Sequence, residues 1–507
     1  MTRNRKIALF LMVLIAGLLL TSVVRAADYK PAVANHELEK AFHELQSGSE
    51  ETAKVRYLWQ NPESWYSRWK MVEDAKSTID CTYFIIDKDI FGQAFLGLLA
   101  KKAKQGIKIR LMIDWRIANS GYMKGMKDKL EELSGYPNIQ IRLYNSCVKN
   151  FLKLFTDFRQ LLASNHDKML LIDGFRSLIG GKNIGADYFV GKGENDIVYR
   201  DTDILMEGQG VAAQLKKAFD DEWGYLKNTL VKPDKINFDD QSARMDLAYR
   251  VMSKYISGMG LYDPTKVNLS DKLREALVEM NAEISKYKEL TGYASFDMWR
   301  GERAKQVKII DKYSRCGALN GITPALVKFI DASKEEIMIQ NPYVVLTETA
   351  EAALKRASER GVKIVIHSNS AKSTDAIYCQ AFLSEDWMRL LKEMPTLRLM
   401  VAPSENERIH SKTFTFDSQL TVIGSYNMDP LSEQVNSEIV AAVLDRPFGT
   451  MVRGRIYKDM NPVLEYKIKR ERDGKVTPVF GPEQHVDPEM IKKINLIRKL
   501  GWLRPLI

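Results

Sequence analysis

Cysteine and histidine are scarce in this chain of 507 residues. The four cysteines stand far apart, at positions 81, 147, 316 and 379, and none belongs to a CxxC pair. This spacing excludes a disulfide scaffold and argues against a structural zinc site. With 45% hydrophobic and 28% charged residues, the composition is that of a globular protein rather than a disordered one. At roughly 100–200 residues per domain, the length allows two or three domains.

The first 26 residues have the pattern of a secretory signal. Three cations precede the apolar run Ile7–Leu20, and Val24-Arg-Ala26 offers small residues at the positions that a signal peptidase reads. An uncleaved membrane anchor is the alternative, because the 18 residues from Ile7 to Val24 are near the lower limit for crossing a bilayer. Either interpretation predicts export across the cytoplasmic membrane, to the periplasm or cell envelope. Residues 1–26 hold four cations and no acid, so the mature chain carries a net charge of +6 instead of +10.

Two stretches of the chain repeat one order of elements. Each has a strand-like apolar run, a helical run closed by glycine, and a second strand-like run. The runs are 79–86, 95–104 and 107–114 in the first half, and 337–345, 350–360 and 362–367 in the second. Gly106 and Gly361 close the two helices. A helix, a C-terminal glycine and a β-branched strand predict a βαβ unit with parallel strands.

A short motif occurs once in each repeat. Its members are His166, Lys168, Asp173 and Asn183 in the first half, and His410, Lys412, Asp417 and Asn427 in the second. In both copies Lys follows His by two residues, Asp follows Lys by five, and Asn follows His by 17. Four matching residues at fixed spacing, twice, within a duplicated frame indicate a functional site.

The spacing predicts that His and Lys of each copy share one face of a strand, because residues i and i+2 project to the same side. Ammonium and amide groups both suit phosphate oxygens. The candidate phosphate-binding residues are therefore Lys168, Asn183, Lys412 and Asn427. Two facing copies would place two imidazoles, which can serve as nucleophile and acid near neutral pH, across one phosphate. The other histidines and the cysteines show no metal-ligand spacing, and we expect neither a metal nor a cofactor.

The motif resembles the signature of the phospholipase D superfamily, HxKxxxxD followed by Gly/Ser-x-Asn, over roughly residues 60–230 and 320–445. The resemblance implies an α/β fold: two duplicated phospholipase D-like α/β/α domains, related by pseudo-two-fold symmetry, that form one active site. It also implies a metal-free, two-step exchange in which His166 forms a phosphohistidine and His410 acts as general acid, then base. The candidate catalytic set is His166, Lys168, Asp173, His410, Lys412 and Asp417. Within this set the two aspartates look more like structural hydrogen-bonders than catalysts.

The superfamily also pairs each histidine with a carboxylate further along the chain, which orients the imidazole. Glu438, 28 residues after His410, matches that pattern. In the first half we expect Asp203, 37 residues after His166, because an apolar strand follows it as one follows Glu438. Asp201 remains a possible partner; so does Glu194, which looks more like a surface residue. The longer spacing predicts an inserted loop near 191–198.

The resemblance divides the chain into five parts. They are the signal or anchor at 1–26, a first phospholipase D-like domain at 50–230, a helical insertion at 231–318, a second domain at 319–450 and a basic amphipathic extension at 451–507. In the extension, the apolar residues 491, 494, 496, 497, 500, 502 and 503 fit one face of a helix. That helix is either an interfacial membrane helix or an ordinary docking helix.

Within the superfamily, the stretches 180–188, 200–208, 368–375 and 424–432 are most similar to bacterial cardiolipin synthases. One departure is Leu431, where that group often has arginine. The expected function is thus an envelope phosphatidyltransferase acting on phospholipids at a membrane surface. A secreted phospholipase D that uses water as acceptor is the alternative. A nuclease is less favoured, because nucleic acid requires a basic, aromatic-lined groove and no block dense in lysine and arginine stands at the motifs.

Overall fold

The computed structural model describes residues 34–507, apart from Ser47, Lys124, 151–155, 157–158, 234–237, Val267, 314–318, 403–405 and Arg472. The predicted signal or anchor at 1–26 lies outside the described residues. Within the described part of the chain, no helix has both the length and the apolar character needed to cross a membrane.

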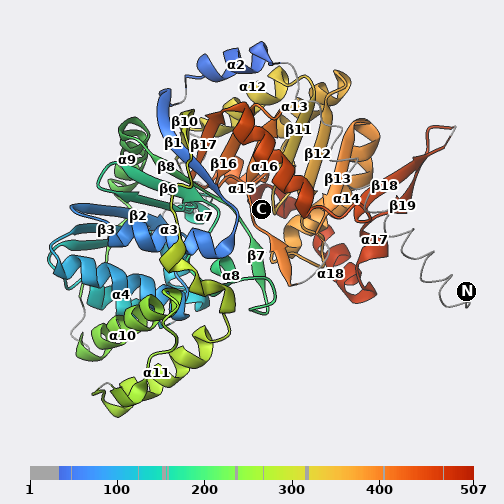
Figure 1. Ribbon diagram of the computed structural model, residues 1–507. Helices are drawn as coiled ribbons and strands as arrows, with labels where there is room; N and C mark the ends of the chain where they lie inside the picture. Colours follow the sequence, from blue (N-terminus) through green and yellow to red (C-terminus); the bar gives the residue numbers. More distant parts are fainter. Residues whose placement is uncertain are drawn as a thin grey trace, which may run out of the picture.

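One continuous mixed sheet runs through both halves of the molecule (Figure 1). The first half supplies β1 (Glu51–Leu58), β2 (Thr78–Tyr83), β3 (Lys108–Asp114), β4 (Ile139–Tyr144), β5 (Met169–Ile172), β6 (Arg176–Gly180), β8 (Asp203–Glu207) and β9 (Thr229–Leu230). The second half supplies β10 (Ala304–Lys312), β11 (Glu336–Gln340), β12 (Lys363–Ser368), β13 (Leu397–Val401), β15 (Thr413–Phe416), β16 (Leu420–Gly424), β17 (Glu438–Leu444), β18 (Glu465–Arg470) and β19 (Val476–Phe480). A separate parallel pair consists of β7 (Val198–Arg200) and β14 (Glu407–Ile409).

The strand pairings show the duplication directly. At the centre, β1 and β10 pair antiparallel and join the two halves. Moving outward, β8–β6–β5–β2–β3–β4 in the first half corresponds to β17–β16–β15–β11–β12–β13 in the second. The strands β2, β3 and β4 are parallel, as are β11, β12 and β13. The predicted βαβ units and the duplicated α/β/α fold are confirmed.

Helices cover both faces of this sheet (Figure 1). Those before the second half are α2 (His36–His43), α3 (Asn61–Glu73), α4 (Ile90–Lys104), α5 (Trp115–Ala118), α6 (Lys127–Leu133), α7 (Arg159–Leu162), α8 (Ala186–Phe189), α9 (Gln209–Trp223), α10 (Phe238–Ile256) and α11 (Asp271–Ile284). Those that follow are α12 (Ile322–Ala332), α13 (Glu348–Glu359), α14 (Ile377–Glu393), α15 (Pro430–Gln434), α16 (Arg446–Asp459), α17 (Pro482–His485) and α18 (Pro488–Arg498). Short 3₁₀ turns include η1 (Gly121–Met123), η3 (Pro264–Lys266), η4 (Lys288–Thr291), η5 (Tyr293–Ser295) and η6 (Gly501–Leu506).

The crossover helices begin and end where their sequences predict. The side chain of Asp89 accepts from the backbone of Gly92 to cap α4, and Thr347 caps α13 through Ala350. Gly106 and Gly361 follow these helices with φ of +86° and +82°. Residues with a side chain rarely adopt this left-handed conformation, so glycine ends each helix at low cost.

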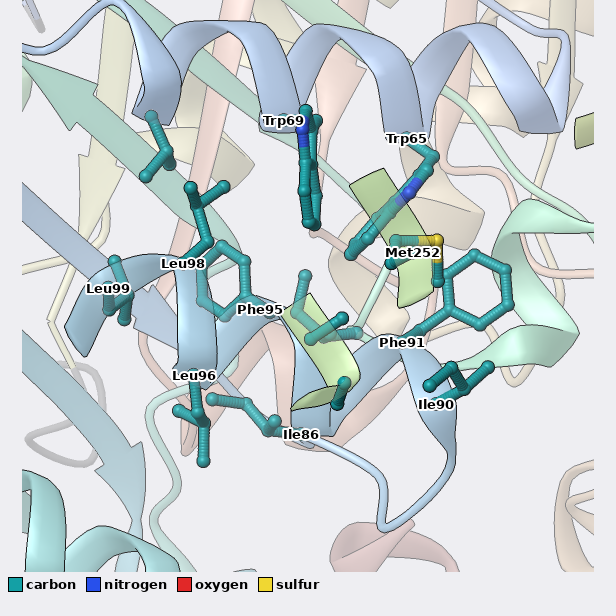
Figure 2. Close-up of a cluster of buried hydrophobic side chains, with 14 of the residues drawn as sticks. Trp65, Trp69, Ile86, Ile90, Phe91, Phe95, Leu96, Leu98, Leu99 and Met252 are labelled. Carbon is teal, nitrogen blue, oxygen red and sulfur yellow. The ribbon is translucent and has the colours of Figure 1, made fainter. Parts of the chain in front are cut away.

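Aromatic side chains fill the core on the outer face of the first domain. In Figure 2, Trp65 and Trp69 of α3 point toward Phe91 and Phe95 of α4, with Met252 of α10 beside them. The rings of Trp65 and Phe91 meet edge to face at 4.9 Å. Such contacts add to the burial of apolar area. They attach the insertion helix α10 firmly to the first domain.

A second core lies between the two halves. It includes Phe219 and Trp223 of α9, Phe448 and Val452 of α16, and strand residues from both domains. Because both halves contribute to this core, they pack as one body, and the strands of the two halves that adjoin it are held in a fixed geometry.

The predicted helical insertion at 231–318 contains α10, α11 and the turns η3, η4 and η5. It also contains β10, which pairs with β17 along seven residues and belongs to the second domain's sheet. Likewise α16 starts at Arg446, inside the predicted second domain, and continues to Asp459, inside the predicted extension. The sequences of β10 and α16 are polar and do not indicate that these elements belong to the second domain, because their packing partners are far away in the chain.

The C-terminal extension docks on the second domain. Ile494 of α18 is 1% exposed and packs with Ala371 and Ala381, while Ile491 and Ile497 pack at the edge of the same cluster. Leu496, Leu500 and Trp502 face outward and are 65%, 39% and 69% exposed. The predicted single apolar face is therefore divided between a docking side and an exposed side.

Candidate active site

At two places, called crossings here, the backbone of one domain pairs with the backbone of the other. These crossings bring the motif histidines to the centre of the molecule. β14, which ends just before His410, runs parallel to β7 of the first domain (Figure 1). Its pseudo-symmetric counterpart is a parallel bridge between Asn165 and Ser437. The backbone N–H of His410 donates to Arg200 at 2.9 Å, and that of His166 donates to Ser437 at 3.2 Å. Each histidine is thus placed beside the other domain.

The carboxylate partners follow from this crossing. Nδ1 of His166 lies 3.0 Å from both carboxylate oxygens of Glu438. Nδ1 of His410 lies 2.6 Å from Oδ2 of Asp201. Arg200 immediately precedes Asp201, and Ser437 immediately precedes Glu438. Each histidine is therefore fixed by two hydrogen bonds to neighbouring residues of the other domain, one from its backbone N–H and one from its side chain. Each Nδ1 faces a carboxylate, which leaves Nε2 for a substrate.

The expectation that Asp203 orients a histidine is wrong. Asp203 forms a two-pronged ion pair with Arg68 of α3 at 2.7 and 3.0 Å, and both side chains are fully buried. Asp203 begins the strand β8, whereas Asp201 stands two residues earlier, at the crossing. An apolar strand follows both Asp203 and the histidine partner Glu438, so this feature does not distinguish a sheet residue from a histidine partner. Glu194 accepts from the backbone of Gly191 and Glu289 and stabilises a loop.

Unequal acid lengths explain a difference between the two motifs. A Cβ on Gly181 would lie 2.2 Å from the Asp201 carboxylate, so only glycine fits there. The equivalent Ser425 instead donates to Glu438, as does Ser432 at 2.6 Å. A serine stands at the equivalent position of the second motif, where the longer Glu438 accepts its hydroxyl. The serines were visible in the sequence, but nothing in their spacing indicated this role.

The two motif lysines are buried beside the histidines. Lys168 is fully buried and Lys412 is 1% exposed. Nζ of Lys168 donates to the backbone oxygen of His166 at 2.6 Å, and Nζ of Lys412 donates to that of His410. Burial lowers the pKa of Lys168 to about 7 and also lowers that of Lys412. A buried ammonium group has lost the water that stabilises its positive charge. An anion that enters the site stabilises that charge again, so the buried lysines favour anion binding.

Burial also keeps both imidazoles neutral. It lowers the pKa of His166 to about 4, outweighing the raising effect of Glu438. It lowers the pKa of His410 as well, with the charge of Lys412 acting in the same direction. Burial opposes ionisation of Glu438 and Asp201, yet the positive groups facing them keep the pKa of each below its ordinary value. The resting site thus combines neutral imidazoles with ionised acids.

Asp173 and Asp417 are hydrogen-bonders in the hairpin turns, as expected. Both have positive φ, 55° and 48°. Asp173 accepts from the backbone of Lys76, Ser77 and Thr78 at 2.7–2.9 Å. Asp417 accepts from the backbone of 334–336 at 2.9 Å. They tie each motif hairpin to the start of a neighbouring strand and touch neither histidine in the described contacts.

The two motif asparagines differ in their contacts. Asn183 accepts from the backbone of Ile85 at 3.1 Å and donates to the Tyr188 hydroxyl at 3.0 Å. Asn427 is 5% exposed, and its Oδ1 has no hydrogen-bond partner among the described residues. Asn183 is thus linked to Tyr188, whose ring lies 5.5 Å from that of His410. Asn427 keeps polar capacity for a ligand.

Aromatic residues that the sequence did not reveal surround the imidazoles. The ring of Phe84 meets His166 edge to face at 5.2 Å. Three tyrosines surround His410, namely Tyr188, Tyr199 and Tyr343, with ring centroids 5.5, 5.2 and 6.3 Å away. Hydroxyls of two of them, Tyr343 and Tyr199, donate to Asp375 at 2.9 and 3.2 Å. Phe84 directly follows β2, and Tyr343 lies three residues after β11. The signal that could have found them is an aromatic residue close to the end of the first strand of each βαβ unit.

Comparisons with known proteins agree with this arrangement. The model of the family described as "Cardiolipin synthase, PLD-like domain" matches residues 69–223 and 326–459. Cardiolipin synthase C of Escherichia coli (strain K12) is 25% identical over 445 residues, which cover 84% of this chain and 88% of that protein. Cardiolipin synthase A of Pseudomonas syringae pv. syringae (strain B728a) is 24% identical over 421 residues, or 83% and 71% of the two chains.

Among solved structures, the phosphatidylserine synthase of Haemophilus influenzae Rd KW20 aligns with 93% of this chain and 100% of its own, with a TM-score of 0.61 and 12% identity. This likeness shows a shared fold. The family match spans more than half of the chain and includes both copies of the motif and both histidine-paired carboxylates.

Asp201 and Asp203 should respond differently to the same substitution. Asp201→Asn should lower phosphodiester turnover by roughly 10²–10⁴-fold with little effect on stability, because His410 loses its orienting charge. Asp203→Asn should instead lower the free energy of unfolding by about 3–5 kcal/mol, since Arg68 becomes an unpaired buried charge. Hydrolysis of a chromogenic phosphodiester and urea unfolding measure the two effects. The reverse pattern would show that Asp203 orients the histidine.

The buried histidine should make folding sensitive to acid. The pKa of His166 is 6.5 when exposed and about 4 in the folded chain. The unfolded chain therefore binds a proton that the folded chain does not, and stability should fall as the pH drops from 6.5 toward 4. Urea unfolding across this range should show a steeper loss for wild type than for His166→Gln, whose side chain does not titrate. Equal slopes would contradict the shifted pKa.

Proposed function

Since the chain belongs to the cardiolipin synthase family of phospholipase D-like domains and is an enzyme of the phospholipase D superfamily, we propose that it is an envelope phosphatidyltransferase of cardiolipin-synthase type. It exchanges a phospholipid phosphodiester through a phosphohistidine intermediate. The observation that carries this proposal is the pair of imidazoles in one interdomain site, each fixed by a carboxylate and accompanied by a buried lysine. Relatives named cardiolipin synthases support the choice of a lipid substrate.

In the first step, His166 attacks phosphorus. Its Nδ1–H donates to Glu438, so Nε2 carries the lone pair that forms the P–N bond. The bond from phosphorus to the leaving head-group oxygen breaks, and that oxygen takes the proton from Nε2 of His410. Asp201, 2.6 Å from Nδ1, stabilises His410 while it is protonated. The negative charge of the phosphate itself favours this protonated form.

In the second step, the acceptor hydroxyl replaces the histidine. Neutral His410 takes the hydroxyl proton, the acceptor oxygen bonds to phosphorus, and the P–N bond to His166 breaks. Lys168 and Lys412 balance the charge on the non-bridging oxygens throughout. The same steps with water as acceptor describe a phospholipase D, so the acceptor alone separates the two functions.

The apolar surroundings of the site favour an alcohol over water. Lys168, Lys412 and His410 are each no more than 5% exposed, and Phe84 and three tyrosines cover the imidazoles. A site that holds little water lengthens the life of a phosphohistidine. The residues 1–26 support export, and the exposed side of α18 and of the segment that follows it, through η6, supports contact with a membrane surface.

That exposed side has the composition of an interfacial surface. Leu496, Leu500 and Trp502 point outward, and the neighbouring Lys492, Lys493 and Lys499 are also exposed. Apolar side chains can enter the head-group region while the ammonium groups meet anionic lipids. Docking of α18 through Ile494 holds this surface in a fixed place on the enzyme.

The catalytic proposal predicts a transfer product. Purified protein in vesicles that contain phosphatidylglycerol should make cardiolipin and release glycerol, and His166→Ala and His410→Ala should each abolish turnover because each histidine has its own step. Lipid mass spectrometry measures the products. Release of phosphatidic acid alone, without transfer even at high alcohol concentration, would replace this function with hydrolysis.

The surface proposal predicts weaker vesicle binding without loss of fold. Replacing Leu496, Leu500 and Trp502 together by serine should reduce co-sedimentation with anionic vesicles, since apolar insertion is lost. Activity on a soluble short-chain substrate should remain. The matched control is Val463→Ser, which removes a side chain that is 78% exposed elsewhere on the same domain. Unchanged sedimentation of the triple variant would place membrane contact elsewhere.

A further inference from the structure

The turn η6 lies against α15 in the middle of the molecule, where Figure 1 marks the C-terminal end of the chain. In the first turn of α15, the backbone N–H of Leu431 donates to the backbone oxygen of Ile507 at 3.2 Å. The first N–H groups of a helix have no partner within that helix, so Ile507 satisfies one of them. Residues 501–507 therefore help to hold α15 in place.

Helix α15 in turn supports His166. Its Ser432 donates to Glu438 at 2.6 Å, and Glu438 lies 3.0 Å from Nδ1 of His166. The same serine hydroxyl accepts from the backbone N–H of the motif residue Asn427 at 3.2 Å. Ser432 and Glu438 are both fully buried, so water cannot replace these bonds if α15 moves. A chain of hydrogen bonds thus runs from Ile507 through α15 to His166.

The side chain of Ile507 reaches the surroundings of His410. Ile507 and Tyr343 both pack at the edge of one small buried cluster, formed by Val345, Cys379 and Phe382. The ring of Tyr343 lies 6.3 Å from that of His410, edge to face. Close packing transmits small displacements, so a shift of Ile507 would loosen the support of Tyr343 beside His410.

Arg504 fixes η6 to α14 of the second domain. Its guanidinium pairs with Asp386, which is buried, and lies 5.3 Å from the centre of the Phe382 ring. Asp386 also pairs with Arg389 at 3.3 Å. Removal of Arg504 would therefore release η6 without leaving a buried acid unpaired, which makes this contact suitable for a selective test.

From these contacts we propose that η6 is a positioning element of the active site, in which Arg504 and Ile507 hold α15 and Tyr343 in place and, through them, both histidines. This inference rests on the proposed use of His166 and His410 in one exchange, and it is independent of the acceptor. Bond formation at phosphorus requires aligned groups, so a small displacement of either imidazole is costly. Because η6 also carries the exposed Trp502, one segment joins the lipid-facing surface to the geometry of catalysis.

Two substitutions in the full-length protein loosen η6 in different ways. Arg504→Ala removes its ion pair, and Ile507→Ser removes its apolar contact. The matched control is Arg470→Ala, because Arg470 donates to the backbone oxygens of Leu391 and Lys392 at 3.0 Å and so ties the β18–β19 hairpin, rather than η6, to the same helix α14. Turnover of a soluble chromogenic phosphodiester gives kcat and KM, and urea unfolding checks that each variant is folded.

The expected result is a kcat that falls by about 10–100-fold in Arg504→Ala and in Ile507→Ser, while KM stays within about twofold of wild type, because alignment of the reacting groups is lost and binding is not. Arg504→Lys keeps a cation for Asp386 and should recover most of the rate, and Arg470→Ala should match wild type. A wild-type kcat in either η6 variant, an equal loss in Arg470→Ala, or a loss equal to the unfolded fraction would overturn the positioning role.

A spectroscopic measurement separates this inference from the proposed function. If wild type turns over no phosphodiester, the proposed function fails, and the geometry can still be followed through the Nδ1 proton of His166 that faces Glu438. Proton NMR should show this charge-assisted bond as a downfield resonance, assigned by its loss in His166→Gln. Faster exchange with water should remove the resonance in Arg504→Ala and Ile507→Ser but not in Arg470→Ala. Its absence from wild type, its persistence in either η6 variant, or its loss from the control would overturn the inference.

Discussion

The crossed pairing of each histidine with a carboxylate of the other domain is the interaction on which the site depends. His166 meets Glu438, and His410 meets Asp201, through contacts of 3.0 and 2.6 Å between buried groups. A buried acid that loses its partner is costly, since its charge has neither water nor a counter-ion. Neither domain can therefore complete its own motif. Each motif is complete only when the two domains are packed against each other.

The rest of the fold keeps this crossing in register. β1 and β10 join the two halves antiparallel, and β8 and β17 are the strands beside them. β17 begins at Glu438, and β8 begins two residues after Asp201. The shared core of α9 and α16 fills the space behind these strands. A shift of one residue along β17 would turn Glu438 to the opposite face of the sheet. Apolar packing on both faces prevents that shift, so the precision of a polar site comes from an apolar core.

The sequence allowed much of this to be predicted, because the information was local. The βαβ units, the glycine helix ends and the two His-Lys-Asp-Asn sets depend on residues close together in the chain, and duplication made them stand out. The carboxylate of the first half did not follow from the same kind of reasoning. Asp201 and Asp203 are two residues apart and both are buried; only the partner, His410 or Arg68, distinguishes them. The strand β10 was missed for a related reason, since its pairing with β17 spans more than a hundred residues.

Pseudo-symmetry does not make the two halves of the site equivalent, and the differences match what the proposed two-step exchange requires. His166 is held by a longer acid that two serines also engage, and its neighbouring ring is Phe84, which offers no hydrogen bond. Such surroundings favour a neutral, immobile nucleophile. His410 has the shorter contact to its acid and lies among three tyrosines. A short, charge-assisted bond stabilises an imidazolium. Duplication provides one histidine in each half of the site. In the proposed exchange, their different surroundings would give them different roles: His166 would bond to phosphorus, and His410 would donate and accept the proton.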